Sequence, residues 1–178
     1  MKIILLSSFF LIKLTMPAQA DDVYIPQINT SSYADISITG TFNTIDVLQT
    51  SQIDTAHYLQ MNILGNHNTI GIVQKDTTKT LVVDMDGDYN TIDILQQGTG
   101  GSAVDLGIVG DDAIISILQQ GAGDHTATID LENAGGSWNF SLVQSSDTNL
   151  TYNLLDNDNN LNGVCYVGVC NISIFQQQ

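Results

Sequence analysis

The stretch that decides the fold is residues 87–96, Gly-Asp-Tyr-Asn-Thr-Ile-Asp-Ile-Leu-Gln, because its pattern returns along the chain. Four further segments align with it without a gap, from a glycine to a glutamine nine residues later, and a sixth, 168–176, is one residue shorter. The glutamines of the six copies are Gln49, Gln74, Gln96, Gln119, Gln144 and Gln176. A repeat as short as the interval between these successive glutamines is typical of solenoids and stacked arrays.

Apolar residues lie four and two positions before each of these glutamines, and the residue between them is small or polar. An alternation with a period of two predicts a strand with one buried face. The predicted core residues are Ile45, Val47, Ile70, Ile72, Ile92, Ile94, Ile115, Ile117, Phe140, Leu142, Ile172 and Ile174. A second alternating run precedes most of the glycines, for example 34–38 before Gly40 and 59–63 before Gly65.

Each copy is therefore expected to form strand, turn, strand, turn. One such hairpin cannot bury its apolar face alone, but copies stacked at about 4.8 Å give every strand backbone partners above and below. The predicted fold is all-β, a β-solenoid of about six degenerate repeats whose two sheets face each other in a cross-β, amyloid-like stack. The repeat domain is predicted to span 33–178, after an N-terminal segment, 21–32.

The recurring glutamine predicts a column of stacked side chains. Six amides at one position of successive rungs can each donate a hydrogen bond to the next, as in a cross-β ladder. Asn43, Asn68 and Asn90 predict a second column, which Ala113 interrupts. The alternative is that these residues mark turns, but glutamine is not a turn residue and it recurs in one register, which favours the ladder.

The first twenty residues have the features of a secretory signal peptide. Lys2 precedes an apolar stretch, 3–14, and Ala18-Gln19-Ala20 provides a cleavage site of small residues. The alternative is a membrane anchor, but the apolar run is too short and Lys13 interrupts it. The sequence therefore predicts a secreted protein that is not inserted in a membrane after cleavage.

The charge of the chain excludes one broad class of partner. It has 178 residues, 43% hydrophobic and 13% charged, with four lysines, no arginine and nineteen acids, for a net charge of −15. Loss of residues 1–20 removes two lysines and leaves −17 on the secreted chain. A nucleic-acid-binding protein needs a basic face, and this chain has none. Its apolar content is too high for a disordered chain.

A specific turn follows two of the repeats. Residues 96–100 and 119–123 both read Gln-x-Gly-x-Gly. This turn, after a strand that ends in glutamine, resembles the curlin repeat of curli subunits, and the resemblance covers most of the chain from about Tyr33 to Gln178. The second glutamine of the curlin repeat is matched only by Gln60.

The resemblance implies a secreted bacterial protein of the cell surface, a subunit of a curli-type fimbrium that serves adhesion in a biofilm. It implies three kinds of partner: further copies of the chain, other curli-type subunits and the outer-membrane curli export machinery. Two alternatives remain open. One is a minor nucleating or capping subunit, and the other is a monomeric β-solenoid that binds or adheres through one flat face. A row of Thr44, Thr69 and Thr91 ends at Ile114, which weakens the monomeric alternative.

The two cysteines, Cys165 and Cys170, lie close together around Gly168. In an exported chain a disulfide is the first hypothesis, and two free thiols are the alternative. A zinc site would need further ligands nearby.

Two acidic runs could hold calcium. They are 84–90 and the run that contains Asp156, Asp158, Asn160 and Asn162. Oxygen ligands suit calcium, but neither run ends in the glutamate that completes an EF-hand loop, so a polar turn is the favoured interpretation. We expect no bound metal and no cofactor.

The three histidines, His57, His67 and His125, lie in different repeats and belong to no catalytic motif. We interpret them as separate surface residues in turns. Paired acids such as Asp111-Asp112 also lie at expected turns on a body with no evident cleft. The sequence therefore predicts a protein that is not an enzyme.

Overall fold

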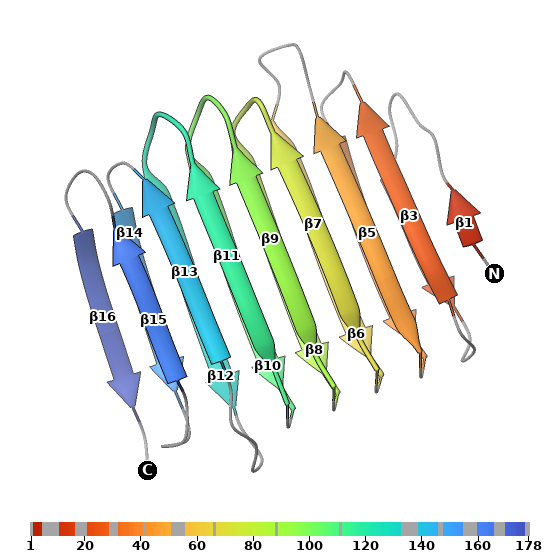
Figure 1. Cartoon of the computed structure of the whole chain (residues 1–178). Helices are drawn as coiled ribbons and strands as arrows, with labels where there is room; N and C mark the ends of the chain where they lie inside the picture. Colours follow the sequence, from red (N-terminus) through yellow and green to blue (C-terminus); the bar gives the residue numbers. More distant parts are fainter. Residues whose placement is uncertain are drawn as a thin grey trace.

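The computed structural model is an all-β solenoid in which two parallel sheets lie face to face (Figure 1). It describes residues 2–4, 11–16, 21–28, 32–40, 42–50, 56–65, 67–87, 89–110, 112–132, 139–145, 148–154, 160–165 and 170–176. Over these residues it has sixteen strands and no helix that could cross a membrane.

The chain alternates between the two sheets. The first sheet holds β1 (Lys2–Ile4), β3 (Asp21–Ile28), β5 (Asn43–Thr50), β7 (Thr69–Lys75), β9 (Thr91–Gln97), β11 (Ile114–Gln120), β13 (Asn139–Ser145) and β15 (Asn160–Cys165). The second sheet holds β2 (Leu11–Met16), β4 (Ser32–Thr39), β6 (His57–Leu64), β8 (Lys79–Asp86), β10 (Ser102–Val109), β12 (His125–Glu132), β14 (Thr148–Leu154) and β16 (Cys170–Gln176). An odd strand and the even strand that follows it make one rung.

Every strand pairs in parallel with the strands one rung away, without a shift in register. Ile70 of β7, for example, lies between Ile45 of β5 and Ile92 of β9. The residues that line up in this way form columns along the axis of the solenoid. A column of like residues is the direct consequence of the sequence repeat, because each copy places the same residue type at the same height of its strand.

The core lies between the sheets and is filled by the period-two residues. The burial of β5 alternates strictly over its first five residues, and that of β6 and β8 alternates in the same way. Ile45, Ile70 and Ile92 have 1% or less of their surface exposed. The prediction of core residues is confirmed from Ile45 to Leu142. The side chains of Ile172 and Ile174 lie outside the described set.

The predicted solenoid fold is confirmed, but the stack has eight rungs in the described chain rather than about six. Residues 21–28, expected to precede the repeats, form β3 and pair with β5. Residues 160–165 form β15, which has no glutamine to mark it. Strands β1 and β2 lie within the predicted signal peptide and pair with β3 and β4. The cleavage of residues 1–20 stays a prediction.

The two ends of the chain lie at opposite ends of the stack (Figure 1). Strands β1 and β2 are outermost at one end, and β15 and β16 are outermost at the other. In the described part of the chain each of these strands has a strand partner on one side only.

Candidate functional site

A column of buried glutamines runs along the inside of the first sheet. Gln49, Gln74, Gln96 and Gln119 have no exposed surface, and Gln144 is 2% exposed. Each side-chain Nε2 donates to the Oε1 of the glutamine one rung closer to the N-terminus. The N–O distances are 2.7 Å from Gln74 to Gln49, 2.8 Å from Gln96 to Gln74 and 2.9 Å from Gln119 to Gln96.

The same amides connect the two sheets. Besides the bond to the preceding glutamine, Nε2 also donates to a main-chain carbonyl at the start of the facing even strand in Gln49, Gln74, Gln96 and Gln119. Gln74 bonds to the carbonyl of Thr80 at 3.3 Å, and Gln96 bonds to that of Ala103 at 3.2 Å. A buried amide with both its protons bonded avoids the 1–3 kcal/mol or so that an unsatisfied polar group costs. The glutamine column, defined as Gln27 to Gln144, therefore closes one side of the core.

Gln27 belongs to this column, although the sequence comparison missed it. It is 2% exposed, accepts a bond of 2.6 Å from Gln49 and donates to the carbonyl of Tyr33. The glycine that opens the other copies is replaced here by Ala18. The alternation of Val23, Ile25 and Gln27 was the signal that could have found it.

Gln176 does not belong to the column, and its predicted place is corrected. Strand β16 lies in the second sheet, where Gln176 pairs with Leu154. The residue that follows Gln144 in the first sheet is Cys165. Ile172 and Ile174 likewise pair with Leu150 and Tyr152, and not with Phe140 and Leu142. The physical reason is the long segment after Gln144, which contains two strands, β14 and β15, before β16 begins.

A shorter asparagine column lies at the other side of the core. Asn43, Asn68 and Asn90 are each 1% exposed. Nδ2 of Asn43 donates to Oδ1 of Asn68 at 2.9 Å, and Asn68 donates to Asn90 at the same distance. Each Nδ2 also donates to the carbonyl of the glycine three residues earlier. These bonds run toward the C-terminus, opposite in direction to those of the glutamines.

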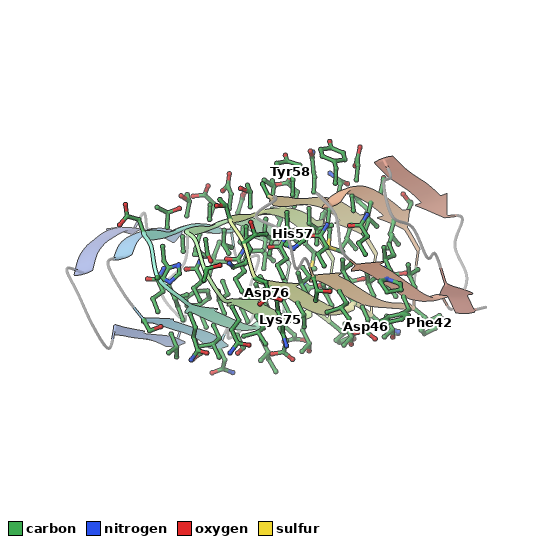
Figure 2. The ribbon with its side chains drawn as sticks, turned by 90° about the horizontal axis from the view of Figure 1, so that it is seen from above. Phe42, Asp46, His57, Tyr58, Lys75 and Asp76 are labelled. Carbon is green, nitrogen blue, oxygen red and sulfur yellow. The ribbon has the colours of Figure 1, made fainter. Side chains whose placement is uncertain are left out.

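The first inward residues of the even strands form a buried polar column that the sequence did not predict. Its members are His57, Lys79, Ser102 and His125, which pair in this order across β6, β8, β10 and β12. None is more than 2% exposed. Figure 2 shows His57 between the two sheets, whereas the adjacent Tyr58 points outward. The interpretation of His57 and His125 as surface histidines is therefore wrong, while His67 is exposed as expected.

Main-chain carbonyls surround this polar column. His57 Nε2 lies 3.0 Å from the carbonyl oxygen of Lys75. Lys79 Nζ donates to the carbonyls of Thr77 and Thr99. A carbonyl only accepts, so Nε2 of His57 carries the proton, and Nδ1 of the neutral ring is an acceptor without a partner among the described residues.

Burial determines how these groups bind protons. It lowers the pKa of Lys79, against an opposing attraction from Asp76. It also lowers the pKa of His57 and of His125, and the charge of Lys79 lowers both further, while their bonds to carbonyls act in the opposite direction. The column therefore resists protonation, because it places basic groups where water cannot solvate their charge.

The carboxylates on the outside are spaced along the axis. Asp46 and Asp93 occupy one column of the first sheet, but Gly71 lies between them. Asp84 and Asp130 occupy one column of the second sheet, with Gly107 between them. In the described register no carboxylate pairs directly with another.

Two sets of aromatic side chains stack outside the core. The rings of Tyr33 and Tyr58 lie 5.0 Å apart and nearly parallel. His67 lies 4.8 Å from Phe42 and 4.9 Å from Tyr89 between ring centroids. Figure 2 shows Phe42 and Asp46 on the same outer side. The row of Phe42, His67 and Tyr89 ends at Asp112, and the row of Tyr33 and Tyr58 ends at Thr80.

The remaining predicted sites lie at the margin of the described structure. Cys165 ends β15 and Cys170 begins β16, but their side chains are not described, so the disulfide stays a prediction. Asp156 and Asp158 lie outside the described residues, and Asn160 and Asn162 are described in main chain only. Within the described residues no group of three or more His, Cys, Asp or Glu side chains is arranged to hold a metal ion.

The arrangement provides two stacked sheets that side-chain amide bonds connect. The predicted site residues that it brings together are those of the glutamine column and the asparagine column. No protein-family model, curated protein or solved structure matches the chain.

Proposed function

We propose that this chain is a secreted structural subunit of a curli-like extracellular amyloid fibre, which serves adhesion in a biofilm matrix. The observation that carries the proposal is the register of the stack: from β3 to β13 of the first sheet, two apolar residues and a glutamine recur at the same height of each rung. A further molecule placed on the end of the stack can continue both sheets by the pairing that each rung already makes.

The ends of the stack support this function. In the secreted chain, which lacks β1 and β2, the end strands are β3 and β4 at one end and β15 and β16 at the other. Each has main-chain donors and acceptors along one edge, and such edges template the addition of another strand. An in-register parallel stack with amide ladders is the arrangement found in cross-β assemblies. The resemblance of 96–100 and 119–123 to the curlin repeat adds the export route, by a signal peptide and the outer-membrane curli machinery.

A second candidate function is a minor nucleating or capping subunit. The specific observation is that β15 departs from the repeat: it places Gly163 opposite Leu142 and Cys165 opposite Gln144. The glutamine column therefore stops one rung short of the C-terminal end. A molecule that joins a fibre through its other end and presents this rung to solvent would slow further addition.

The experiment that tests the proposal uses the secreted chain, residues 21–178, incubated in physiological salt and observed by negative-stain microscopy and X-ray diffraction. Fibres with a reflection near 4.7 Å are the expected result. A parallel sample is added to a growing curli-type subunit, since a capping subunit would slow that growth and a nucleating subunit would shorten its lag. A monodisperse monomer that leaves that growth unchanged would show that the proposal is wrong.

A further inference from the structure

A row of aliphatic side chains runs along the outer face of the first sheet. In β5, β7, β9, β11 and β13 the residue directly before the column glutamine points outward, is leucine or valine, and is half-buried. This aliphatic row consists of residues that pair from rung to rung: Leu48, Val73, Leu95, Leu118 and Val143. An apolar row that continues along a whole outer face is typical of a contact surface.

Polar positions flank the aliphatic row on both sides. Two residues before it in each strand, side chains that can accept a hydrogen bond alternate with one glycine: Asp46, Gly71, Asp93, Ser116 and Ser141. Two residues after it in each strand, every side chain can donate a hydrogen bond: Thr50, Lys75, Gln97, Gln120 and Ser145. The first flank is therefore complementary to the second.

The glycine of the first flank lies between two carboxylates. A Cβ atom at Gly71 would lie 2.6 Å from Oδ1 of Asp46, so the carboxylate of Asp46 leans over the glycine. Asp93 pairs with Gly71 from the next rung, at a distance of about 4.8 Å along the axis. The space above Gly71 can therefore receive the charged end of a long cationic side chain.

Lys75 has the charge and the length that this position requires. It ends β7, and Figure 2 shows it on the same outer side of the sheet as Asp46. The other lysine of the secreted chain, Lys79, is buried. Lys75 and Gly71 are four residues apart on one strand, about 13 Å, and strand side chains stand roughly perpendicular to the sheet. The cation and the position that suits it therefore meet only between two molecules.

A second copy that is rotated by half a turn about an axis parallel to the stack brings them together. This rotation keeps the direction of the stack and reverses the direction of the strands. The aliphatic row of one copy then faces that of the other, and each first flank faces a second flank. In the rung of β7, Lys75 of each copy lies over Gly71 of the other, between Asp46 and Asp93.

The neighbouring rungs fit the same arrangement. Thr50 lies opposite Asp46 and Gln97 lies opposite Asp93, so from β5 to β13 no carboxylate of these flanks faces another. The outer face of the second sheet lacks this complementarity. From β4 to β12 it has no outward lysine, and its acids would face each other in a similar pair: Asp35, Asp84, Asp86, Asp105, Asp130 and Glu132.

We propose that two copies of this chain pair side by side through the aliphatic rows of their first sheets, with Lys75 of each copy between Asp46 and Asp93 of the other. Face-to-face sheets pack at about 10 Å, which accommodates a layer of leucine and valine side chains from each copy. The pairing of two molecules does not depend on fibre growth. In fibres, which rest on the proposed function, the contact repeats with every molecule and joins two fibres laterally.

The test measures the association of freshly purified secreted chain, residues 21–178, by sedimentation velocity from micromolar to millimolar concentration at physiological salt. The variants Lys75→Glu and D46K/D93K each place like charges opposite one another. We expect each to dimerise at least about tenfold more weakly than the wild-type chain. An equal mixture of the two should recover dimers, because opposite charges then meet at both flanks. In the matched control mixture D84K/D86K replaces D46K/D93K, which makes the same change of charge on the second sheet.

The proposal fails if the wild-type chain stays monomeric at millimolar concentration, or if the control mixture recovers dimers as well as the designed one. It also fails if both variants dimerise as the wild-type chain does, since the contact would then lie elsewhere, for example at the ends of the stack. Circular dichroism checks the fold of each variant. If D46K/D93K does not fold, D46N/D93N and Lys75→Gln take its place, and each should weaken dimerisation by about threefold.

The reflection near 4.7 Å is recorded separately on aged samples. Fibres of a chain that never pairs laterally would contradict this inference alone. Pairs of a chain that never forms fibres would contradict the proposed function alone.

Discussion

At the scale of single residues, the least expected feature is a lysine without any exposed surface. Lys79 lies inside the solenoid between His57 and Ser102, and its Nζ bonds to main-chain carbonyls. The carboxylates of Asp76 and Asp124 raise the pKa values in this column, but by less than burial lowers them. The interior of the stack is therefore sensitive to acid in a way that an apolar core is not.

The two buried histidines predict how stability depends on pH. Their pKa values lie below the ordinary value of 6.5 in the folded chain, so the unfolded chain binds protons more readily. Stability should therefore fall as the pH is lowered from above 6.5 through the folded pKa values. Urea unfolding at a series of pH values measures this slope.

The double variant His57→Gln/His125→Gln should flatten that slope, whereas His67→Gln, on the outside, should leave it unchanged. Asp105 works in the opposite direction at lower pH, because its raised pKa makes the folded chain bind its proton first. If the slope is unchanged in the double variant, groups other than His57 and His125 cause the pH dependence.

The glutamine column predicts a second effect of substitution. Gln96→Ala with Gln119→Ala removes the partners of Gln74 Oε1 and Gln144 Nε2 and leaves them buried. At about 1–3 kcal/mol for each unsatisfied group, we expect a loss of about 4 kcal/mol in the free energy of unfolding, with slower fibre growth.

The control for the glutamines lies one residue further along the same strands. Gln97 and Gln120 are on the outer face and share one exposed contact of 3.5 Å. Gln97→Ala with Gln120→Ala should change the free energy of unfolding by about 0.5 kcal/mol or less. Similar losses in the two double variants would contradict the role assigned to the buried column.

At the scale of strands and turns, the Gln-x-Gly-x-Gly turns are the most constrained elements. Gly121 has a φ of 141°, and a Cβ atom there would lie 1.7 Å from the carbonyl oxygen of Gly98 in the turn below. The turns stack as closely as the strands, and Gly98 donates its amide to the carbonyl of Gln120 at 3.1 Å. Only glycine satisfies both the backbone angle and the close approach.

Gly121→Ala should therefore destabilise the chain by more than about 2 kcal/mol, since it adds backbone strain to a steric clash. Ala122→Ser, at the exposed neighbouring position, should have almost no effect. Thermal unfolding of the two variants provides the comparison. An alanine at 121 that is tolerated as well as the serine at 122 would show that the turns do not stack as described.

The sequence predicted the two sheets and most of the core columns because one-sided burial leaves a period of two in each strand. It misplaced Gln176, since Ile-Ser-Ile-Phe-Gln has the same local pattern in either sheet and only the count of intervening strands decides between them. It also missed the burial of His57 and Lys79, because polar residues before a strand are normally found in turns. Their burial depends on the path of the neighbouring turns, which bring carbonyls to them.

At the scale of the whole molecule, the distribution of charge decides how easily rungs and molecules stack. A net charge of −17 on the secreted chain opposes stacking, and the sequence alone predicts that fibre growth accelerates with salt or as the pH approaches the isoelectric point of about 4.1. The structure shows how this repulsion is reduced: glycine separates Asp46 from Asp93, and another separates Asp84 from Asp130. Two rungs are about 9.6 Å, close to the distance over which salt screens charge.

Filling one of these gaps should increase the repulsion. Gly107→Asp would place three carboxylates on successive rungs, and the space at Gly107 is bounded by the flexible end of Asp84 rather than by main chain. We expect slower fibre growth at low salt and recovery at high salt. Gly107→Asn has nearly the same shape without the charge, and its growth should depend on salt as that of the wild-type chain does. If the two variants behave alike, the spacing of carboxylates has no electrostatic role.

The opposite directions of the two amide columns have a consequence for length. Each column is a row of aligned dipoles, and aligned dipoles add, as they do along a helix. The glutamine bonds run toward the N-terminus and the asparagine bonds run toward the C-terminus. The dipoles of the two columns therefore point in opposite directions along the axis. Part of the axial field cancels within each rung that carries both amides. When such rungs are added, the electric potential difference between the two ends of the stack does not grow with every rung. It therefore does not oppose the next addition.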